Sequence, residues 1–131
     1  MSRREIREHI FKLLFLVEFH SGEDLEEQVR LYLTQHSEIK DENLRYINEK
    51  YHKILGKLPE IDSQIDQVSK GWKIERMGKA DLTVLRLAYY EMKYDDDIPT
   101  GVAINEGVEL AKLFGGEESP AFVNGILAKL V

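Results

Sequence analysis

Apolar residues recur every three or four positions along most of the chain, the spacing that places side chains on one face of an α-helix. The pattern is clearest over residues 99–114, whose apolar face carries Ile104, Val108, Ala111 and Phe114. Pro99 suits the first turn of this predicted helix. Gly115-Gly116 is predicted to end it, because glycine enters the left-handed conformation without a clash. Ser119 and Pro120 then predict the start of a last helix, as N-cap and first helical residue.

The same periodicity predicts five earlier helices, at about residues 3–20, 24–35, 42–57, 59–70 and 80–94. Ser2 and Glu5 have the spacing of a capping box at the start of the first one. This regular pattern and a content of only three prolines predict an all-α fold. The clearest candidate for a boundary between subdomains lies near Gly71. We therefore expect one domain, residues 1–131, with an N-terminal subdomain of about 1–70 and a C-terminal subdomain of about 71–131.

Composition narrows the class of protein further. The chain has no cysteine, which excludes disulfides and thiolate metal sites and favours a reducing compartment. Its start, MSRREIREH, is charged where a signal peptide needs an apolar core. No apolar run approaches the roughly 18–20 residues of a membrane span. We therefore expect a cytoplasmic protein with no membrane partner.

The net charge of −6 argues against general affinity for nucleic acid, but the basic residues are clustered. One cluster lies in residues 2–12 and contains Arg3, Arg4, Arg7 and Lys12. The other lies in residues 70–79 and contains Lys70, Lys73, Arg76 and Lys79. Cations in the first turn of a helix oppose its dipole, so the arginines do not serve helix stability. They are better explained by contact with an anion, although a solvated charged face is the competing interpretation.

Trp72 and Arg86, in the C-terminal half of the chain, have environments that the sequence allows us to predict. We expect Trp72 to be buried between helical layers, with base stacking as the less favoured role. Arg86 lies among apolar neighbours in residues 80–94, so it needs a carboxylate partner. Glu106 and Glu109 in the next predicted helix are the expected partners.

We find no pattern typical of catalysis. No two histidines have the spacing of a helical zinc site, and Asp95-Asp96-Asp97 lacks the glycine and glutamate of a calcium loop. Asn105 and Asn124 lie in apolar stretches and are best explained by hydrogen bonds to backbone groups. The sequence therefore predicts a non-enzymatic protein with no metal site and no cofactor.

Three segments together resemble the NusB family of transcription antitermination factors. They are SRREIREHIFKLLF at 2–15, GWKIERMGKADLTVLRLAYYEM at 71–92, and AINEGVELAKLFGG with FVNGIL at 103–127. The match is specific from residue 71 onward, good over 2–15 and loose between 20 and 70. It implies a NusB-like fold, a compact all-α bundle of about seven helices in two subdomains, and a non-enzymatic RNA-binding adaptor.

The resemblance also implies partners. Family members pair with NusE, a small-subunit ribosomal protein, and bind boxA, a short single-stranded element of nascent ribosomal RNA. The pair joins other Nus factors on the elongation complex of RNA polymerase and suppresses premature termination. Carried over to this chain, the RNA contacts are Arg3, Arg4, Arg7 and Phe122, although core packing is the favoured role of Phe122. The acidic positions that face NusE are Glu75 and Asp81, with helix capping as the alternative for Asp81.

Two other interpretations remain open at this stage. In the first, the chain is a structural, dimerising helical module without direct RNA binding, since family members include homodimers that would cover the RNA surface. In the second, it is the RNA-binding part of a ribosomal RNA methyltransferase. The second is disfavoured because the chain ends at Val131 with no cofactor-binding α/β domain.

Overall fold

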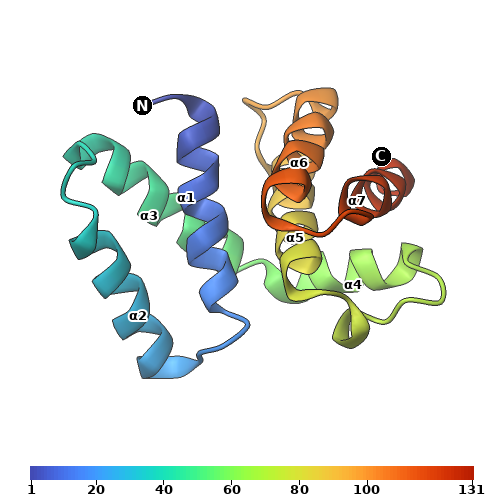
Figure 1. Cartoon of the computed structure of the whole chain (residues 1–131), viewed down its shortest axis with the longest axis horizontal. Helices are drawn as coiled ribbons and strands as arrows, with labels where there is room; N and C mark the ends of the chain where they lie inside the picture. The colour runs from blue at the N-terminus through green and yellow to red at the C-terminus, as the bar shows by residue number, and fades with distance from the viewer. The chain divides into compact units, whose positions relative to one another are not determined.

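A computed structural model describes all residues, 1–131, and contains seven α-helices, one short 3-10 helix and no strand (Figure 1). The all-α prediction and the predicted number of helices are confirmed. The chain forms two compact units, Met1–Leu55 and Gly56–Val131. The division comes earlier than the expected boundary at 70/71, because the helix that precedes Gly71 packs against helices of the second unit.

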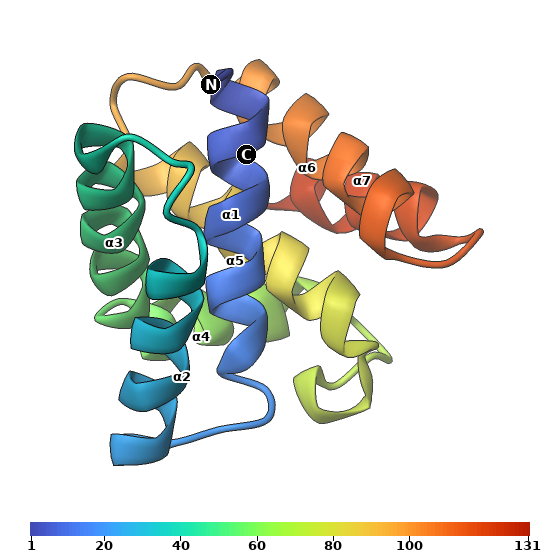
Figure 2. The same cartoon turned by 60° about the vertical axis from the view of Figure 1, so that its left-hand side comes forward.

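The first unit consists of α1 (Arg3–Leu16), α2 (Gly22–Gln35) and α3 (Asp41–Leu55). Helix α1 packs against both α2 and α3 (Figure 2). All three helices contribute buried apolar side chains to this unit, and the connection before α3 adds one more: Ile10, Phe11, Leu13, Leu14, Leu25, Val29, Ile39, Ile47, Tyr51 and Ile54. The predicted capping box is present. The Glu5 N–H donates to Ser2 Oγ at 3.1 Å, and the Ser2 N–H donates to Glu5 Oε1 at 3.0 Å.

The second unit is built around α5 (Lys79–Tyr94), whose residues from Leu82 to Glu91 are all buried. Helices α4 (Leu58–Val68), α6 (Thr100–Phe114) and α7 (Ser119–Lys129) pack against it, and α6 also packs on α7. The short 3-10 helix η1 (Ile74–Arg76) lies between α4 and α5. Apolar residues dominate the buried stretch of α5. A helix that is apolar on all sides requires neighbours around its whole circumference, which α4, α6 and α7 provide.

Arg86 pairs with a carboxylate that the sequence analysis did not name, Asp62. Its Nε and Nη2 each donate to a different carboxylate oxygen of Asp62 on α4, both at 2.8 Å. This bidentate geometry suits the planar guanidinium group. The pair ties α4 to α5, and it explains why α4 belongs to the second unit.

The turn between α6 and α7 also differs from the prediction. Gly115 has φ −95° and ψ −170°, an extended conformation, and the two glycines of this turn do not have positive φ. What requires glycine at position 115 is space, because an added Cβ would lie 2.5 Å from Ser119 Cβ and 2.8 Å from the Ala111 carbonyl oxygen. Ser119 begins α7, and its Oγ accepts from the Gly116 N–H at 2.9 Å.

No helix of the structure has both the length and the apolar character needed to cross a membrane.

Candidate nucleic-acid interface

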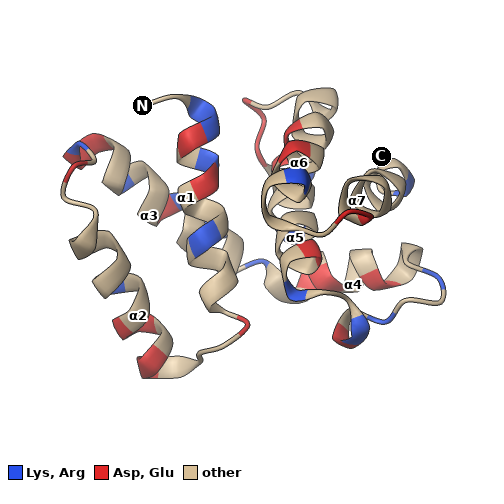
Figure 3. Cartoon of the chain, viewed as in Figure 1, with Lys and Arg blue, Asp and Glu red and all other residues tan.

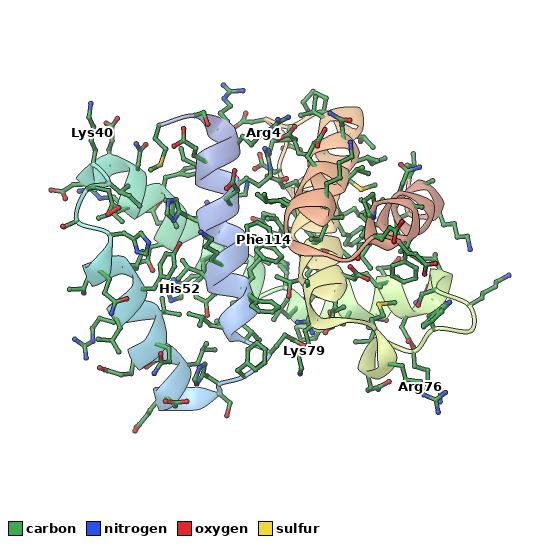
Figure 4. The ribbon with its side chains drawn as sticks, viewed as in Figure 1. Arg4, Lys40, His52, Arg76, Lys79 and Phe114 are labelled. Carbon is green, nitrogen blue, oxygen red and sulfur yellow. The ribbon has the colours of Figure 1, made fainter.

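The arginine cluster lies on the first two turns of α1 and is split between exposed and buried side chains. Arg3 and Arg4 are exposed (Figure 4 labels Arg4). Arg7 retains only 7% of its accessible surface. The expectation that all three arginines form one exposed cluster is therefore wrong for Arg7, and the exposed part of the cluster consists of Arg3 and Arg4.

The burial of Arg7 has a local cause in the helix geometry. Positions 7, 10, 11 and 14 follow the i, i+3, i+4, i+7 spacing of one helical face, and Ile10, Phe11 and Leu14 are all buried. Arg7 begins this same stripe. Ile6, one position before Arg7, is only half-buried.

The capping box holds the first turn of α1 in place. Its two hydrogen bonds satisfy backbone groups of Ser2 and Glu5 that would otherwise be unpaired at a helix start. The turn that carries Arg3 and Arg4 is therefore ordered before any ligand binds, which lowers the entropy cost of binding.

Basic and acidic side chains alternate along α1 (Figure 3), where Glu5 and Glu8 accompany the arginines. The start of α1 carries the arginines, whereas the start of α2 carries Glu23 and Asp24. Acidic side chains near a helix start favour the dipole, and the arginines of α1 oppose it. An anion bound beside Arg3 and Arg4 would remove this unfavourable arrangement.

In the second unit, Phe122 of α7 is half-buried and contacts Trp72. The two rings are edge to face, with centroids 5.8 Å apart and planes at 70°. Trp72 itself is 54% exposed, so the prediction that it is buried between helical layers is wrong. The reason is its position: it lies in the connection between α4 and η1 rather than on a helix face.

The two acidic residues expected to face NusE are accessible to different degrees. Glu75 is exposed on η1, and Asp81 is half-buried in the first turn of α5. The N-cap of α5 is Gly78, which receives no side-chain cap hydrogen bond. Asp81 therefore does not act as the N-cap, although its charge still favours the dipole of α5.

Asn105 and Asn124 are exposed, although the sequence analysis expected them to satisfy backbone groups. Both line an open groove of about 550 Å³ between α6 and α7, together with Gly101, Ile104, Val108, Pro120 and Ala121. Its lining combines apolar side chains with the two amides.

Two of the four histidines, His9 and His36, lie together with Tyr32 in the first unit. His9 Nδ1 lies 2.5 Å from the hydroxyl of Tyr32, and His36 Nδ1 lies 2.8 Å from the Tyr32 carbonyl oxygen. Burial, with added repulsion from His36 and Lys12, lowers the pKa of His9, and burial raises the pKa of Tyr32 to about 12. No three His, Cys, Asp or Glu side chains are grouped so that they could hold a metal ion.

Comparisons with known proteins point to one family. Residues 4–131 match the NusB family. The transcription antitermination protein NusB of Lachnoclostridium phytofermentans is 52% identical over 131 residues, which span 100% of this chain and 99% of that protein. The solved structure of T. maritima NusB has a TM-score of 0.89 and 36% identity, and covers 99% of this chain and 90% of its own. A crystal structure of NusB and NusE in complex with dsRNA has the same fold at a TM-score of 0.84 and 23% identity, covering 98% and 94%.

The chain therefore belongs to the NusB family, as the three resembling segments predict. It is a transcription antitermination factor, a regulatory protein and not an enzyme.

Proposed function

We propose that this chain is a cytoplasmic RNA-binding adaptor that, together with NusE, binds the boxA element of nascent ribosomal RNA. The complex joins RNA polymerase and other Nus factors and suppresses premature termination. The observation that carries the proposal is the pair of exposed arginines, Arg3 and Arg4, on a helix turn fixed by a capping box. These side chains stand on a protein whose net charge is otherwise negative.

Arginine suits an unpaired RNA strand for two reasons. Its planar guanidinium group donates paired hydrogen bonds to phosphate or to a base edge, and it also stacks on an exposed base. Arg3 and Arg4 supply both contacts. Arg7 supports the turn from its buried position, and its role in RNA binding is indirect. Phe122 adds a half-exposed ring in the second unit, which suits contact with a base or a sugar.

The negative net charge sets a limit on what the chain does alone. Sequence-independent affinity grows with the number of phosphates neutralised, and two exposed arginines neutralise few of them. A basic partner such as NusE extends the positive surface. Glu75 and Asp81 are the acidic residues that we assign to that partner, and the exposed position of Glu75 supports the assignment.

Binding of labelled single-stranded boxA RNA, measured with and without NusE, tests the proposal. We expect weak binding by the chain alone and clearly tighter binding when NusE is added. Equal affinity in both cases would contradict cooperative binding with NusE, and no RNA binding in either case would contradict the adaptor function. Particle size measured in parallel detects a homodimer that covers the RNA surface.

A double variant distinguishes binding of NusE from binding of RNA. Glu75→Lys combined with Asp81→Asn should weaken binding to NusE and leave the weak binding of RNA by the chain alone undiminished. Unchanged binding of NusE by this variant would remove these two residues from the partner surface.

A further inference from the structure

The open groove between α6 and α7, of about 550 Å³, is not used by any contact proposed above. No charged residue lines it. Asn105 on α6 and Asn124 on α7 are both exposed there, and neither side-chain amide takes part in a hydrogen bond within the chain. Both amides therefore keep their donors and acceptors for a ligand.

The two asparagines suit the main chain of an extended peptide. An asparagine side chain has a carbonyl acceptor and an NH2 donor, so it can pair with an N–H and a C=O of a peptide main chain. An extended segment leaves these groups unpaired, whereas a helix pairs them internally. Ile104, Val108 and Pro120 are half-buried in the same lining and offer apolar surface to the side chains of such a segment.

The charge around the groove favours a basic ligand. Residues 95–131 carry seven carboxylate side chains and two lysines, and so hold five of the six net negative charges of the chain. Figure 3 shows carboxylates on the connection that leads into α6, at 95–97, and on the turn between α6 and α7, at 117–118. Lys112 follows Val108 by one turn, but its Nζ lies 3.6 Å from Oε1 of Glu109, with which it pairs. Phosphate is therefore disfavoured beside this groove, and lysine or arginine is favoured.

The groove is separate from the surfaces already assigned. The exposed arginines belong to the first unit, and the acidic residues assigned to NusE belong to η1 and α5, which contribute nothing to the lining. Phe122 is part of α7, but its ring contacts Trp72 and does not line the groove. A ligand in the groove is therefore additional to the RNA and NusE contacts.

We propose that the groove between α6 and α7 binds an extended segment of another protein of the elongation complex, apolar at its centre and rich in lysine and arginine at its ends. The amides bind its main chain, the apolar lining receives its central side chains, and the carboxylates at 95–97 and 117–118 attract its cations. The inference rests on the proposed function, which joins the chain to that complex, and adds the surface and the chemistry of one contact. A second copy of this chain fits less well, because its arginine cluster lies on a helix and two chains of net charge −6 repel each other.

Substitutions in the groove are tested in an elongation complex assembled from purified RNA polymerase, boxA RNA, NusE and the other Nus factors. Ala121→Arg puts a long cation into the lining, and we expect the affinity of the chain for this complex to fall by about tenfold. Asn105→Leu combined with Asn124→Leu keeps side-chain size but removes the amide hydrogen bonds, and should also cost about tenfold in affinity. Leu113→Arg is the matched control, because position 113 of α6 is 58% exposed and lies outside the lining; it should bind like the wild type.

The lack of cysteine in the chain allows a photo-cross-linker to be attached at one chosen position. Gly101 is the first groove residue of α6, and a Cβ added there meets nothing within 4 Å. Gly101→Cys labelled with benzophenone maleimide is irradiated in the same assembled complex, with labelled Leu113→Cys as the control. We expect Gly101→Cys alone to cross-link to a protein segment in which lysine and arginine outnumber aspartate and glutamate, as identified by mass spectrometry.

Each variant is also tested for its thermal midpoint and for binding of NusE and boxA RNA without polymerase, and all three should match the wild type. If Ala121→Arg is not folded, the double asparagine variant decides. Wild-type affinity of the folded groove variants for the elongation complex would overturn the inference and leave the proposed function standing. A cross-link from the groove to RNA, to NusE, to a second copy or to an acidic segment would also overturn it. If the wild type binds no boxA RNA with or without NusE, the proposed function itself fails.

Discussion

Asp62 on α4 accepts a hydrogen bond from each of two nitrogens of Arg86 on α5, both at 2.8 Å. The side chain of Arg86 is 10% exposed and that of Asp62 is 27% exposed. Removing the carboxylate leaves a nearly buried guanidinium group without this partner, which is costly. We predict that Asp62→Ala lowers the free energy of unfolding by about 3 kcal/mol, as measured by urea denaturation.

Asp66→Ala is the matched control for this variant. Asp66 is an exposed carboxylate one turn further along α4, and its removal should change stability by no more than about 0.5 kcal/mol. Equal stability of the two variants would show that the Asp62–Arg86 pair contributes little to the second unit.

Adjacent glycines in the turn between α6 and α7 should respond differently to alanine. A Cβ at position 115 would meet Ser119 and the Ala111 carbonyl oxygen, whereas a Cβ at position 116 has nothing within 4 Å. Gly115→Ala should therefore destabilise the protein by about 1–3 kcal/mol, and Gly116→Ala should have little effect. Thermal midpoints of the two variants, measured side by side, check this. A larger loss for Gly116→Ala would mean that backbone conformation rather than space decides the turn.

Protonation of His9 should destabilise the first unit. Burial lowers the pKa of His9, so the folded state binds fewer protons than the unfolded state, whose histidine pKa is about 6.5. The stability from neutral His9 is present above that value and is lost as the pH falls through it toward the lowered folded pKa. The groups that act on His9 are His36 and Lys12, which lower its pKa, and Glu38 and Glu8, which raise it.

The measurement is the free energy of unfolding at several pH values from about 7.5 to about 5.5. Tyr32, whose pKa is raised to about 12, keeps its proton over this range, and its hydroxyl lies 2.5 Å from Nδ1 of His9. His9→Gln cannot take up a proton and should show a smaller loss of stability over this range. Equal pH dependence in both proteins would assign the effect to other groups.

Arg7→Ala should behave as a core substitution. Arg7 is 7% exposed, so its aliphatic stem packs inside the protein, and truncation leaves space unfilled. We expect the free energy of unfolding to fall by about 1–3 kcal/mol. Chemical denaturation measures this directly. An unchanged stability together with a large loss of RNA affinity would instead make Arg7 a direct RNA contact.

Local features of this fold are readable from the sequence. Helix periods and the Ser2–Glu5 capping box depend on neighbours within four residues, and both are present as predicted. The burial of Arg7 was also readable, since it shares the spacing of Ile10 and Leu14. The close spacing of the three arginines in the sequence conceals this difference between Arg7 and the other two.

Long-range features could not be read in this way. Asp62, which pairs with Arg86, lies 24 residues away on a different helix, and several carboxylates satisfy the sequence requirement equally well. Trp72 was expected inside because of its residue type, but its exposure depends on the turn from Ser69 and the place of Phe122. The reason for Gly115 depends likewise on where Ser119 is placed after the turn.

The central claim is that Arg3 and Arg4 at the start of α1 hold an unpaired RNA strand. The most direct test is the affinity of Arg3→Ala combined with Arg4→Ala for single-stranded boxA RNA in the presence of NusE, with the thermal midpoint measured on the same sample. We predict a loss of roughly tenfold or more in affinity and a shallower salt dependence, with almost no change in the midpoint. Wild-type affinity in this folded variant would contradict the claim.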